Sequence, residues 1–149
     1  GDGNCFYNSL LRNPNLQKKF NNQERFRKRL VEDVKNAYDQ DVYIPAIFRF
    51  FQENFDSWCC KTAYKSWGGD VEICLITLLY KIEISMINRL FMKQSSIELL
   101  LQVGNQELDH SLTRSFETVD KSEIFHHVHN NIDNVNQYDF NHFGFLKQR

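Results

Sequence analysis

The sequence lacks long apolar runs, and no stretch approaches the roughly 20 residues that a membrane-spanning helix needs. Its start also lacks the basic segment and following apolar core of a secretory signal. Neither sign of charge dominates, because 18 Lys and Arg nearly balance 19 Asp and Glu, so no strong global field recruits nucleic acid or an anionic membrane. We therefore expect a soluble, cytoplasmic protein with no nucleic-acid or membrane partner in this segment.

Cysteine is scarce and irregularly spaced, which excludes a disulfide framework in a chain of this length and favours a reducing compartment. The four residues are Cys5, Cys59, Cys60 and Cys74. The adjacent pair Cys59 and Cys60 lacks the two-residue spacer of a zinc knuckle. We expect these two and Cys74 to be core or half-buried residues, which leaves Cys5 as the cysteine of interest.

Glycine and proline are also few, with six and two residues, whereas Asn, Lys, Ile and Phe are abundant. This bias is typical of an AT-rich coding genome and points weakly to a microbial or viral protein, which would act in the host cytosol. Hydrophobic residues make up 42% of the 149 residues, which is typical of a folded chain. We expect one domain over 1–149, excised from a longer chain because Gly1 stands in place of methionine.

Apolar spacing predicts helices in the first half of the chain. A short helix follows Cys5 and is broken at 13–15, and an amphipathic helix covers 22–38, with Arg27 among the charged residues expected to face solvent. Pro45 is expected to open a third helix whose apolar side carries residues up to Phe55. A fourth covers 57–66, and Asp70 is expected to cap a fifth.

The second half of the chain predicts strands, which we expect over 82–86, 97–103, 111–116, 124–129 and 140–147. Helices that precede a series of strands favour an α+β architecture, here a small, mostly antiparallel or mixed sheet flanked by helices.

The stretch Asp2-Gly3-Asn4-Cys5 has the composition of a nucleophile loop. Glycine supplies the positive φ that a tight loop-to-helix turn often needs, and asparagine tolerates it. A cysteine at a helix N-terminus faces unpaired N–H groups that stabilise a thiolate and can hold an oxyanion. The alternative is an ordinary helix start, with Asp2 or Asn4 as cap and Cys5 as a small buried residue.

A cysteine nucleophile needs a base, usually a histidine distant in sequence. His142 lies in an aromatic-rich strand near the C-terminus, where its neighbours would hold an imidazole rigidly. His127 and His129 share one face of a strand, as a metal pair would, but no further ligands have suitable spacing. The histidines at 110 and 126 carry no comparable pattern.

Three blocks together resemble the ovarian tumour (OTU) family of cysteine proteases, which are deubiquitinases. They are Asp2-Gly3-Asn4-Cys5-Phe6-Tyr7, Trp67-Gly68-Gly69-Asp70-Val71-Glu72 and Asn141-His142-Phe143, in family order across nearly the whole chain. The resemblance implies a papain-like OTU fold, a monomer, and ubiquitin or polyubiquitin chains as the substrate. It implies that no metal or other cofactor is needed.

The resemblance also implies the site residues. Cys5 is the nucleophile, His142 the general base, and Asp2 helps to order the oxyanion loop. Trp67, Gly68 and Gly69 shape the groove for the ubiquitin tail, or else form only a helix-entry turn beside a core tryptophan.

One position departs from the family pattern. Many OTU enzymes carry Asp or Asn two residues after the histidine, where this chain has Gly144, which has no side chain to orient the imidazole. The third triad member is then Asp2, a loop residue or a group upstream, or the enzyme works as a Cys-His dyad. Two alternatives follow: a catalytically silent ubiquitin-binding module, and a papain-like protease that processes a viral or bacterial polyprotein.

Overall fold

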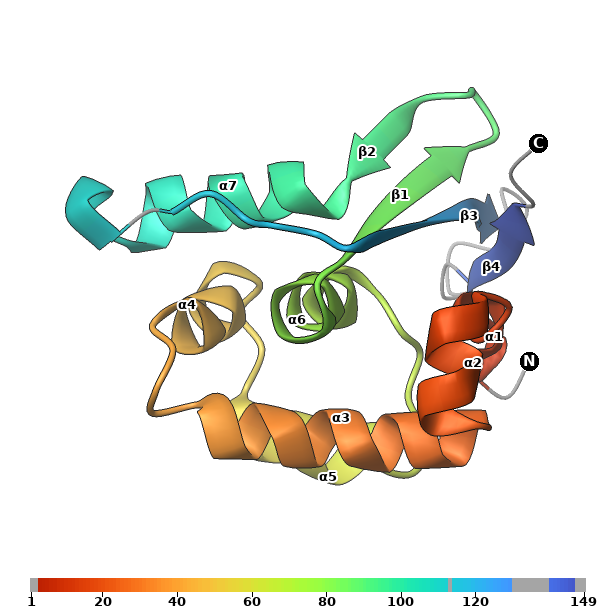
Figure 1. Cartoon of the computed structure of the whole chain (residues 1–149), viewed down its shortest axis with the longest axis horizontal. Coiled ribbons are helices and arrows are strands. Elements are labelled where there is room, and N and C mark those ends of the chain that lie inside the picture. Colours follow the sequence, from red (N-terminus) through yellow and green to blue (C-terminus); the bar gives the residue numbers. More distant parts are fainter. Residues whose placement is uncertain (1–2, 113, 130–139, 147–149) are drawn as a thin grey trace, which may run out of the picture.

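A computed structural model of the chain describes residues 3–112, 114–129 and 140–146, with the backbone alone for 126–129 and 140–146. Its helices are α1 (Cys5–Leu10), α2 (Pro14–Phe20), α3 (Gln23–Ala37), α4 (Tyr43–Phe50), α5 (Phe55–Thr62), α6 (Asp70–Tyr80) and α7 (Ser96–Glu107), with a short 3₁₀ turn at His110–Leu112. Its strands are β1 (Ile82–Asn88), β2 (Lys93–Ser95), β3 (Asp120–His129) and β4 (Phe140–Leu146). The predicted α+β class is confirmed (Figure 1).

The described strands form one mixed sheet in the order β2-β1-β3-β4. The central pair β1 and β3 is parallel, and the two outer strands are antiparallel to their neighbours. A parallel pair needs a long connection, which here contains β2 and α7. The strands predicted over 82–86, 124–129 and 140–147 are confirmed within the described residues, and β3 begins four residues earlier than predicted.

Helix α6 is the centre of the molecule. Its residues from Val71 to Thr77 are all buried, and it packs against α3, α4, α7 and β1 (Figure 1). A helix that is apolar on every side can be stable only when other elements surround it. Residues 71–77 therefore fix where the other helices lie.

Residues 97–103 are helical, so the predicted strand there is wrong. The Ser95 Oγ caps α7 by accepting a hydrogen bond from the Ile97 N–H at 3.2 Å. Leu99, Leu100 and Val103 then face the core at helical spacing. A short apolar run fits a buried helix as well as a strand, and the serine cap decides for the helix.

The strand predicted over 111–116 is also wrong within the described residues, since His110–Leu112 form a 3₁₀ turn and 114–118 have no regular structure. The sequence reasoning missed β2, whose three polar residues are held by pairing with β1. Such a strand has no apolar alternation of its own that could predict it.

Three helix starts differ from the prediction. Helix α2, which the sequence did not predict, begins at Pro14 inside the expected break at 13–15, where the Asn13 Oδ1 caps it by accepting from the Asn15 N–H at 2.9 Å. Helix α4 begins at Tyr43, two residues before Pro45, and ends before the separate helix that starts at Phe55. Helix α6 has Gly69 at its N-cap, so Asp70 is its first residue instead of its cap.

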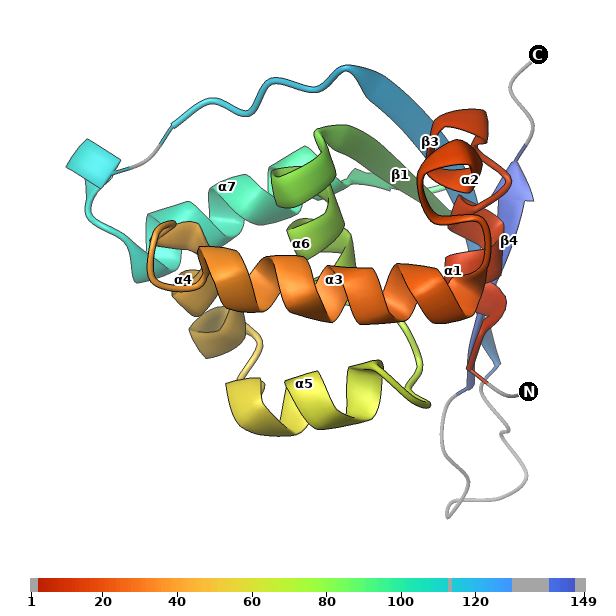
Figure 2. The same cartoon turned by 60° about the horizontal axis from the view of Figure 1, so that its bottom comes forward.

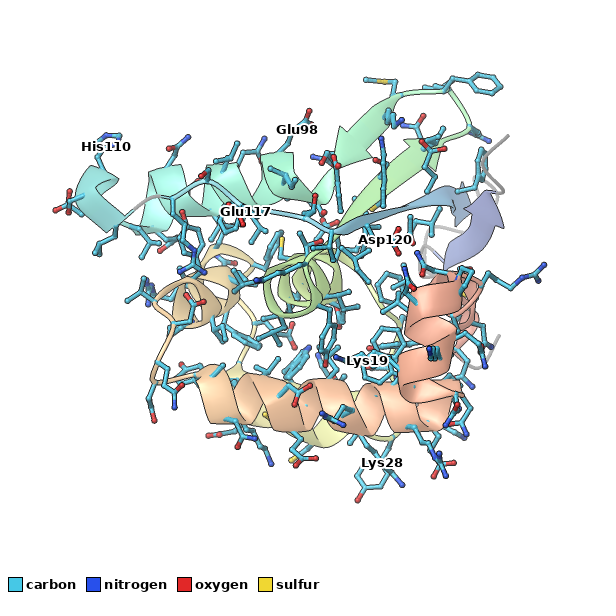
Figure 3. All side chains as sticks on the ribbon, viewed as in Figure 1. Lys19, Lys28, Glu98, His110, Glu117 and Asp120 are labelled. Carbon is cyan, nitrogen blue, oxygen red and sulfur yellow. The ribbon has the colours of Figure 1, made fainter. Side chains whose placement is uncertain are left out.

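The amphipathic helix predicted over 22–38 is confirmed as α3, whose N-cap Asn22 accepts from the Arg25 N–H at 2.9 Å. Figure 3 shows Lys28 on α3 and Glu98 on α7 pointing away from the core. Arg27 is an exception to the solvent-facing charges, as described below. Within the described residues, no helix has the length and apolarity to cross a membrane.

A buried hydroxyl pair joins α6 and α7 to β1. The Ser96 Oγ accepts from the Ile84 N–H at 2.9 Å, and it lies 2.7 Å from the Thr77 Oγ1, which in turn bonds to the Ile82 carbonyl at 2.7 Å. Two hydroxyls thus satisfy backbone groups of β1 that face away from water.

We predict that Ser96→Ala lowers the free energy of unfolding by about 1–3 kcal/mol, because it leaves the buried Ile84 N–H without its acceptor. Urea unfolding followed by circular dichroism measures the change. Ser111→Ala, at an exposed serine, is the control and is expected to leave the unfolding midpoint unchanged. Equal midpoints for both variants would contradict this role of Ser96.

Candidate active site

The turn before Cys5 has the geometry that the sequence predicts. Gly3 is buried and has φ +81°, and a Cβ at this position would lie 3.1 Å from the Ser66 carbonyl oxygen. Any larger residue would be strained by both its backbone angle and its neighbour. Asn4 follows with an ordinary φ of −87°, so the positive φ falls on the glycine alone.

Cys5 is the first residue of α1 and is half-buried. The Ser9 Oγ donates a 2.6 Å hydrogen bond to the Cys5 carbonyl and reinforces this first turn. Asn4 occupies the N-cap position, but no capping hydrogen bond from its side chain is present. Its Oδ1 accepts from Arg27 instead, so the alternative in which Asn4 serves as an ordinary cap is not realised.

Two of the other three cysteines are poor candidates for a nucleophile. Cys59 and Cys74 are buried, and burial raises the pKa of both thiols, which keeps them protonated. Cys60 is exposed, contrary to the prediction of a core or half-buried residue, because it lies on the outer side of α5. Cys5 and Cys60 are therefore the accessible thiols.

The Trp67-Gly68-Gly69 block lies directly against the start of α1. An added Cβ on Gly68 would lie 2.0 Å from the Phe6 Cδ1 and 2.7 Å from the Phe6 Cβ, and Phe6 is fully buried. Only glycine permits this approach. The first two sequence blocks, separated by about 60 residues, are thus in contact through Phe6 and Gly68.

Arg27 lies close to this contact, since it bonds to Gly3 and Ser66. The prediction that it faces solvent is wrong. The side chain is 1% exposed, although it belongs to the charged helix α3. It lies three residues before Leu30 and four before Val31, hence on the apolar face of the helix. The spacing in the sequence places Arg27 on the apolar face, whereas a charged side chain is ordinarily expected on the solvent face.

The Arg27 guanidinium joins the turn before Cys5 to the second block. Its Nη2 donates to the Gly3 carbonyl at 2.9 Å, the Asn4 Oδ1 at 2.9 Å and the Ser66 carbonyl at 2.8 Å. Its Nη1 donates to the Thr62 carbonyl at 3.3 Å, and the guanidinium carbon lies 4.2 Å from the centre of the Tyr7 ring. One side chain therefore contacts both of the chain segments that carry the first two blocks.

Stacked aromatic rings hold α1 in place. Tyr7 packs edge-on against Phe6 and Phe26, with ring centres 5.1 and 5.5 Å apart, and Phe26 stacks on Phe20 at 4.5 Å. Such pairs add directional stability to the burial of apolar area. Residues that support Cys5 are thus anchored to α3.

A hollow of about 400 Å³ borders the second block. Trp67, Gly68 and Gly69 line it together with Glu72, and a Cβ on Gly69 would meet no atom within 4 Å. Glu72 accepts from the Gly69 N–H at 3.1 Å and from the Trp58 Nε1 at 3.3 Å. Burial raises the pKa of this carboxyl, and these hydrogen bonds oppose the shift only in part.

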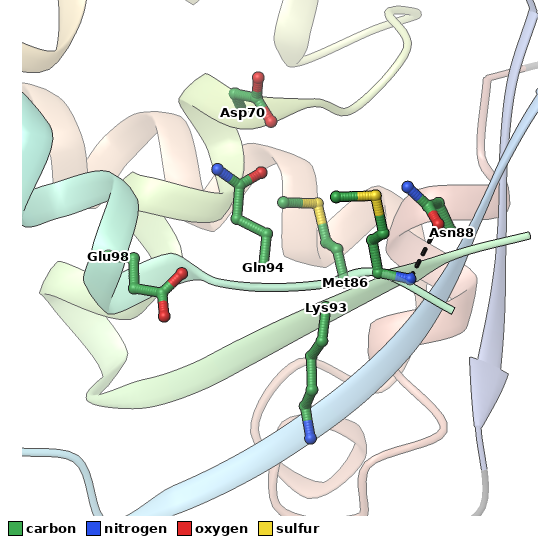
Figure 4. A pocket seen from close by; sticks show the side chains of 7 residues that line it. Asp70, Met86, Asn88, Lys93, Gln94 and Glu98 are labelled. Atoms are coloured by element: carbon green, nitrogen blue, oxygen red, sulfur yellow. Dashed lines mark hydrogen bonds between the residues drawn. The ribbon is translucent and has the colours of Figure 1, made fainter. Parts of the chain in front are cut away.

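A second hollow, of about 440 Å³, adjoins the first through Asp70 (Figure 4). Met86 and Met92 contribute thioether side chains to it, and Lys93 and Glu98 contribute charges. A hydrogen bond of 3.1 Å from the Met92 N–H to the Asn88 Oδ1 closes the β1–β2 turn at its rim. The Gly69-Asp70 corner therefore separates two concave surfaces.

Strand β4, which carries His142, lies beside α1, as Figures 1 and 2 both show. Its register pairs His142 with His127 and Gly144 with Phe125 of β3. The backbone of the third block is therefore next to the helix that begins with Cys5. Asp2, expected to order the oxyanion loop, lies outside the described residues.

Among the side chains that the structure describes, no group of three or more His, Cys, Asp or Glu residues could hold a metal ion. A half-buried cysteine thus begins α1. The glycine-rich block 67–69 packs on Phe6 of this helix, and β4 lies beside the helix.

This is an α+β protein with the arrangement of a candidate thiol site. A scan against protein-family models found no match, and neither did a search of curated proteins.

We predict that Gly68→Ala lowers the free energy of unfolding by about 1–3 kcal/mol, because its methyl group must displace the Phe6 ring. Gly69→Ala is the control one residue away, where the methyl group has open space and only the smaller penalty of alanine at the α6 N-cap is expected. Thermal unfolding of both variants measures the difference. A similar loss for the two would contradict the close packing of Gly68 on Phe6.

Proposed function

We propose that the chain is a thiol-dependent deubiquitinase with a papain-like OTU fold, which hydrolyses the isopeptide bond after the C-terminal glycine of ubiquitin. The observation that carries the proposal is the convergence of three distant sequence blocks. The first two are in contact through Gly68 and Phe6, and α1 lies beside the strand that contains His142.

The reaction follows the general chemistry of a cysteine nucleophile. The Cys5 thiolate attacks the carbonyl carbon of the ubiquitin glycine, forming a C–S bond and a tetrahedral oxyanion held by N–H groups of the 2–5 loop. Collapse of this intermediate breaks the C–N bond, and the departing lysine amine takes a proton from the His142 imidazolium. Water, deprotonated by His142, then attacks the thioester and releases the ubiquitin carboxylate and the Cys5 thiolate.

The glycine-rich block is proposed to receive the extended ubiquitin tail. The tail ends in glycines, and an extended chain of small residues can approach closest where the wall has no side chains. Gly69 faces open space beside the hollow that Trp67 also lines, which suits this role. Ubiquitin or polyubiquitin is thus the proposed partner of a monomeric enzyme in the cytoplasm, or in the host cytosol for a microbial protein.

Gly144 offers no side chain to orient the imidazole, so the third triad member is Asp2, a loop residue or an upstream group, or the enzyme works as a Cys-His dyad. This glycine is also the observation that favours a second function, a catalytically silent ubiquitin-binding module. Measurable ubiquitin affinity without cleavage of any chain type would identify that module. Cleavage of peptides but not of ubiquitin chains would instead identify a polyprotein-processing protease.

We predict that a ubiquitin probe with a C-terminal electrophile labels the wild type and that Cys5→Ala abolishes the labelling, because the adduct forms on this sulfur. Intact-mass spectrometry detects the added mass of the probe. Cys60→Ser removes the other accessible thiol and serves as the control, with labelling expected to equal that of the wild type. A folded wild type that stays unlabelled would remove the proposal.

We predict that His142→Ala lowers the rate of diubiquitin cleavage by at least about 100-fold, as expected for loss of a general base, and leaves the circular dichroism spectrum unchanged. His110→Ala is the control, since His110 lies at the opposite end of the molecule from β4 (Figures 1 and 3). Gel-based cleavage assays measure both rates. Retained activity in His142→Ala would exclude its role as the base.

A further inference from the structure

The buried charge of Arg27 has a use beyond the packing of α3. An arginine that is 1% exposed loses most of its hydration, and hydrogen bonds must replace that water. Within the described residues the guanidinium bonds to carbonyl and amide oxygens alone, and these belong to the turn before Cys5, the end of α5, Ser66, and Gln23 on its own helix. Neutral acceptors gathered from separate segments are typical of an arginine that fixes backbone geometry.

The bond to Gly3 determines how one peptide unit is turned. In a trans peptide the C=O and the N–H point in opposite directions, and the unit is rigid. When Arg27 Nη2 holds the Gly3 oxygen at 2.9 Å, the Asn4 N–H must therefore point away from the guanidinium. The same nitrogen holds the Asn4 side chain at 2.9 Å, which limits rotation on both sides of the Asn4 backbone.

The bond to Ser66 couples this turn to the glycine-rich block. Arg27 Nη2 reaches the Ser66 carbonyl at 2.8 Å, and this is the oxygen that an added Cβ on Gly3 would approach to 3.1 Å. Arg27, which belongs to neither segment, therefore fixes the distance between the turn at Gly3 and the glycine-rich block that follows Ser66.

We propose that Arg27 is a positioning residue for the reaction: it sets the orientation of the Gly3–Asn4 peptide in the oxyanion loop and the spacing between that loop and the tail-binding block. The inference rests on the proposed function for its effect on catalysis, although the orientation of the peptide does not depend on it. Arg27 acts through Gly3 and Asn4 and touches no reacting atom.

The test uses Gln23, which contacts the guanidinium of Arg27 and helps to fix its orientation. Its Oε1 accepts from the Arg27 Nε at 2.9 Å, and the residue is only half-buried at the start of α3. Gln23→Leu removes the acceptor and frees the guanidinium to turn, whereas Gln23→Glu keeps an acceptor at the same place and suits a helix N-terminus. This pair perturbs the orientation of Arg27 without removing the buried side chain.

Two readouts are measured on the pair and on the wild type. Hydrogen exchange of peptides covering 3–10 is expected to speed up in Gln23→Leu and to match the wild type in Gln23→Glu, with α6 unchanged in both. On a ubiquitin substrate, kcat is expected to fall roughly 3- to 10-fold in Gln23→Leu with an unchanged KM, because misplacement of the loop affects the transition state more than binding. Arg27→Lys, which keeps the charge but not the fork, is expected to lose more than about 10-fold in kcat.

Unchanged exchange at 3–10 in Gln23→Leu would overturn the inference, whether or not the protein cleaves ubiquitin. So would a loss of activity confined to KM, or an equal loss of kcat in Gln23→Glu. If the wild type has no activity on ubiquitin, the proposed function fails separately, and faster exchange restricted to Gln23→Leu would still support the positioning of the Gly3–Asn4 peptide by Arg27.

Discussion

The hydrogen bonds of the Arg27 guanidinium are the interaction on which the candidate site depends. They link Gly3, Asn4 and Ser66, which come from two segments that share no secondary structure. Without Arg27 as their common donor, these three oxygens would lose a hydrogen bond in a buried place, and their like partial charges would repel one another. The residue is thus costly to bury and, once buried, gives the turn before Cys5 a single geometry.

Other parts of the fold hold Arg27 and the start of α1 in position. Helix α6 is buried from Val71 to Thr77 and packs against α3, which carries Arg27, while the rings of Tyr7, Phe26 and Phe20 hold α1 against α3. Gly68 packs directly against the Phe6 ring, at a distance that leaves no room for a Cβ. Three of the 13 phenylalanines, Phe6, Phe20 and Phe26, therefore help to set the position of one short helix.

The sequence predicted well those features that depend on local chemistry. The helix 22–38 and the strands at 82–86 and 124–129 follow from spacing alone, and the positive φ at Gly3 follows from the turn it must make. Prediction failed where tertiary contacts decide. Residues 97–103 became a helix because Ser95 caps it and α4 and α6 cover it, and β2 exists only through pairing. Arg27 was misplaced because charge outweighed its position on the apolar face.

The contact between Phe6 and Gly68 could not be predicted from spacing, although the OTU resemblance implies that the two blocks share a site. Resemblance likewise pairs Cys5 with His142, and the packing of β4 beside α1 is compatible with that pairing.

The most direct measurement is the incubation of the purified protein with a panel of differently linked diubiquitins, with intact-mass analysis of the products over time. The account predicts conversion of at least one linkage to monoubiquitin with a free C-terminal carboxylate, and no conversion by Cys5→Ala. A folded protein that leaves every linkage intact would contradict the account, as would cleavage that persists in Cys5→Ala.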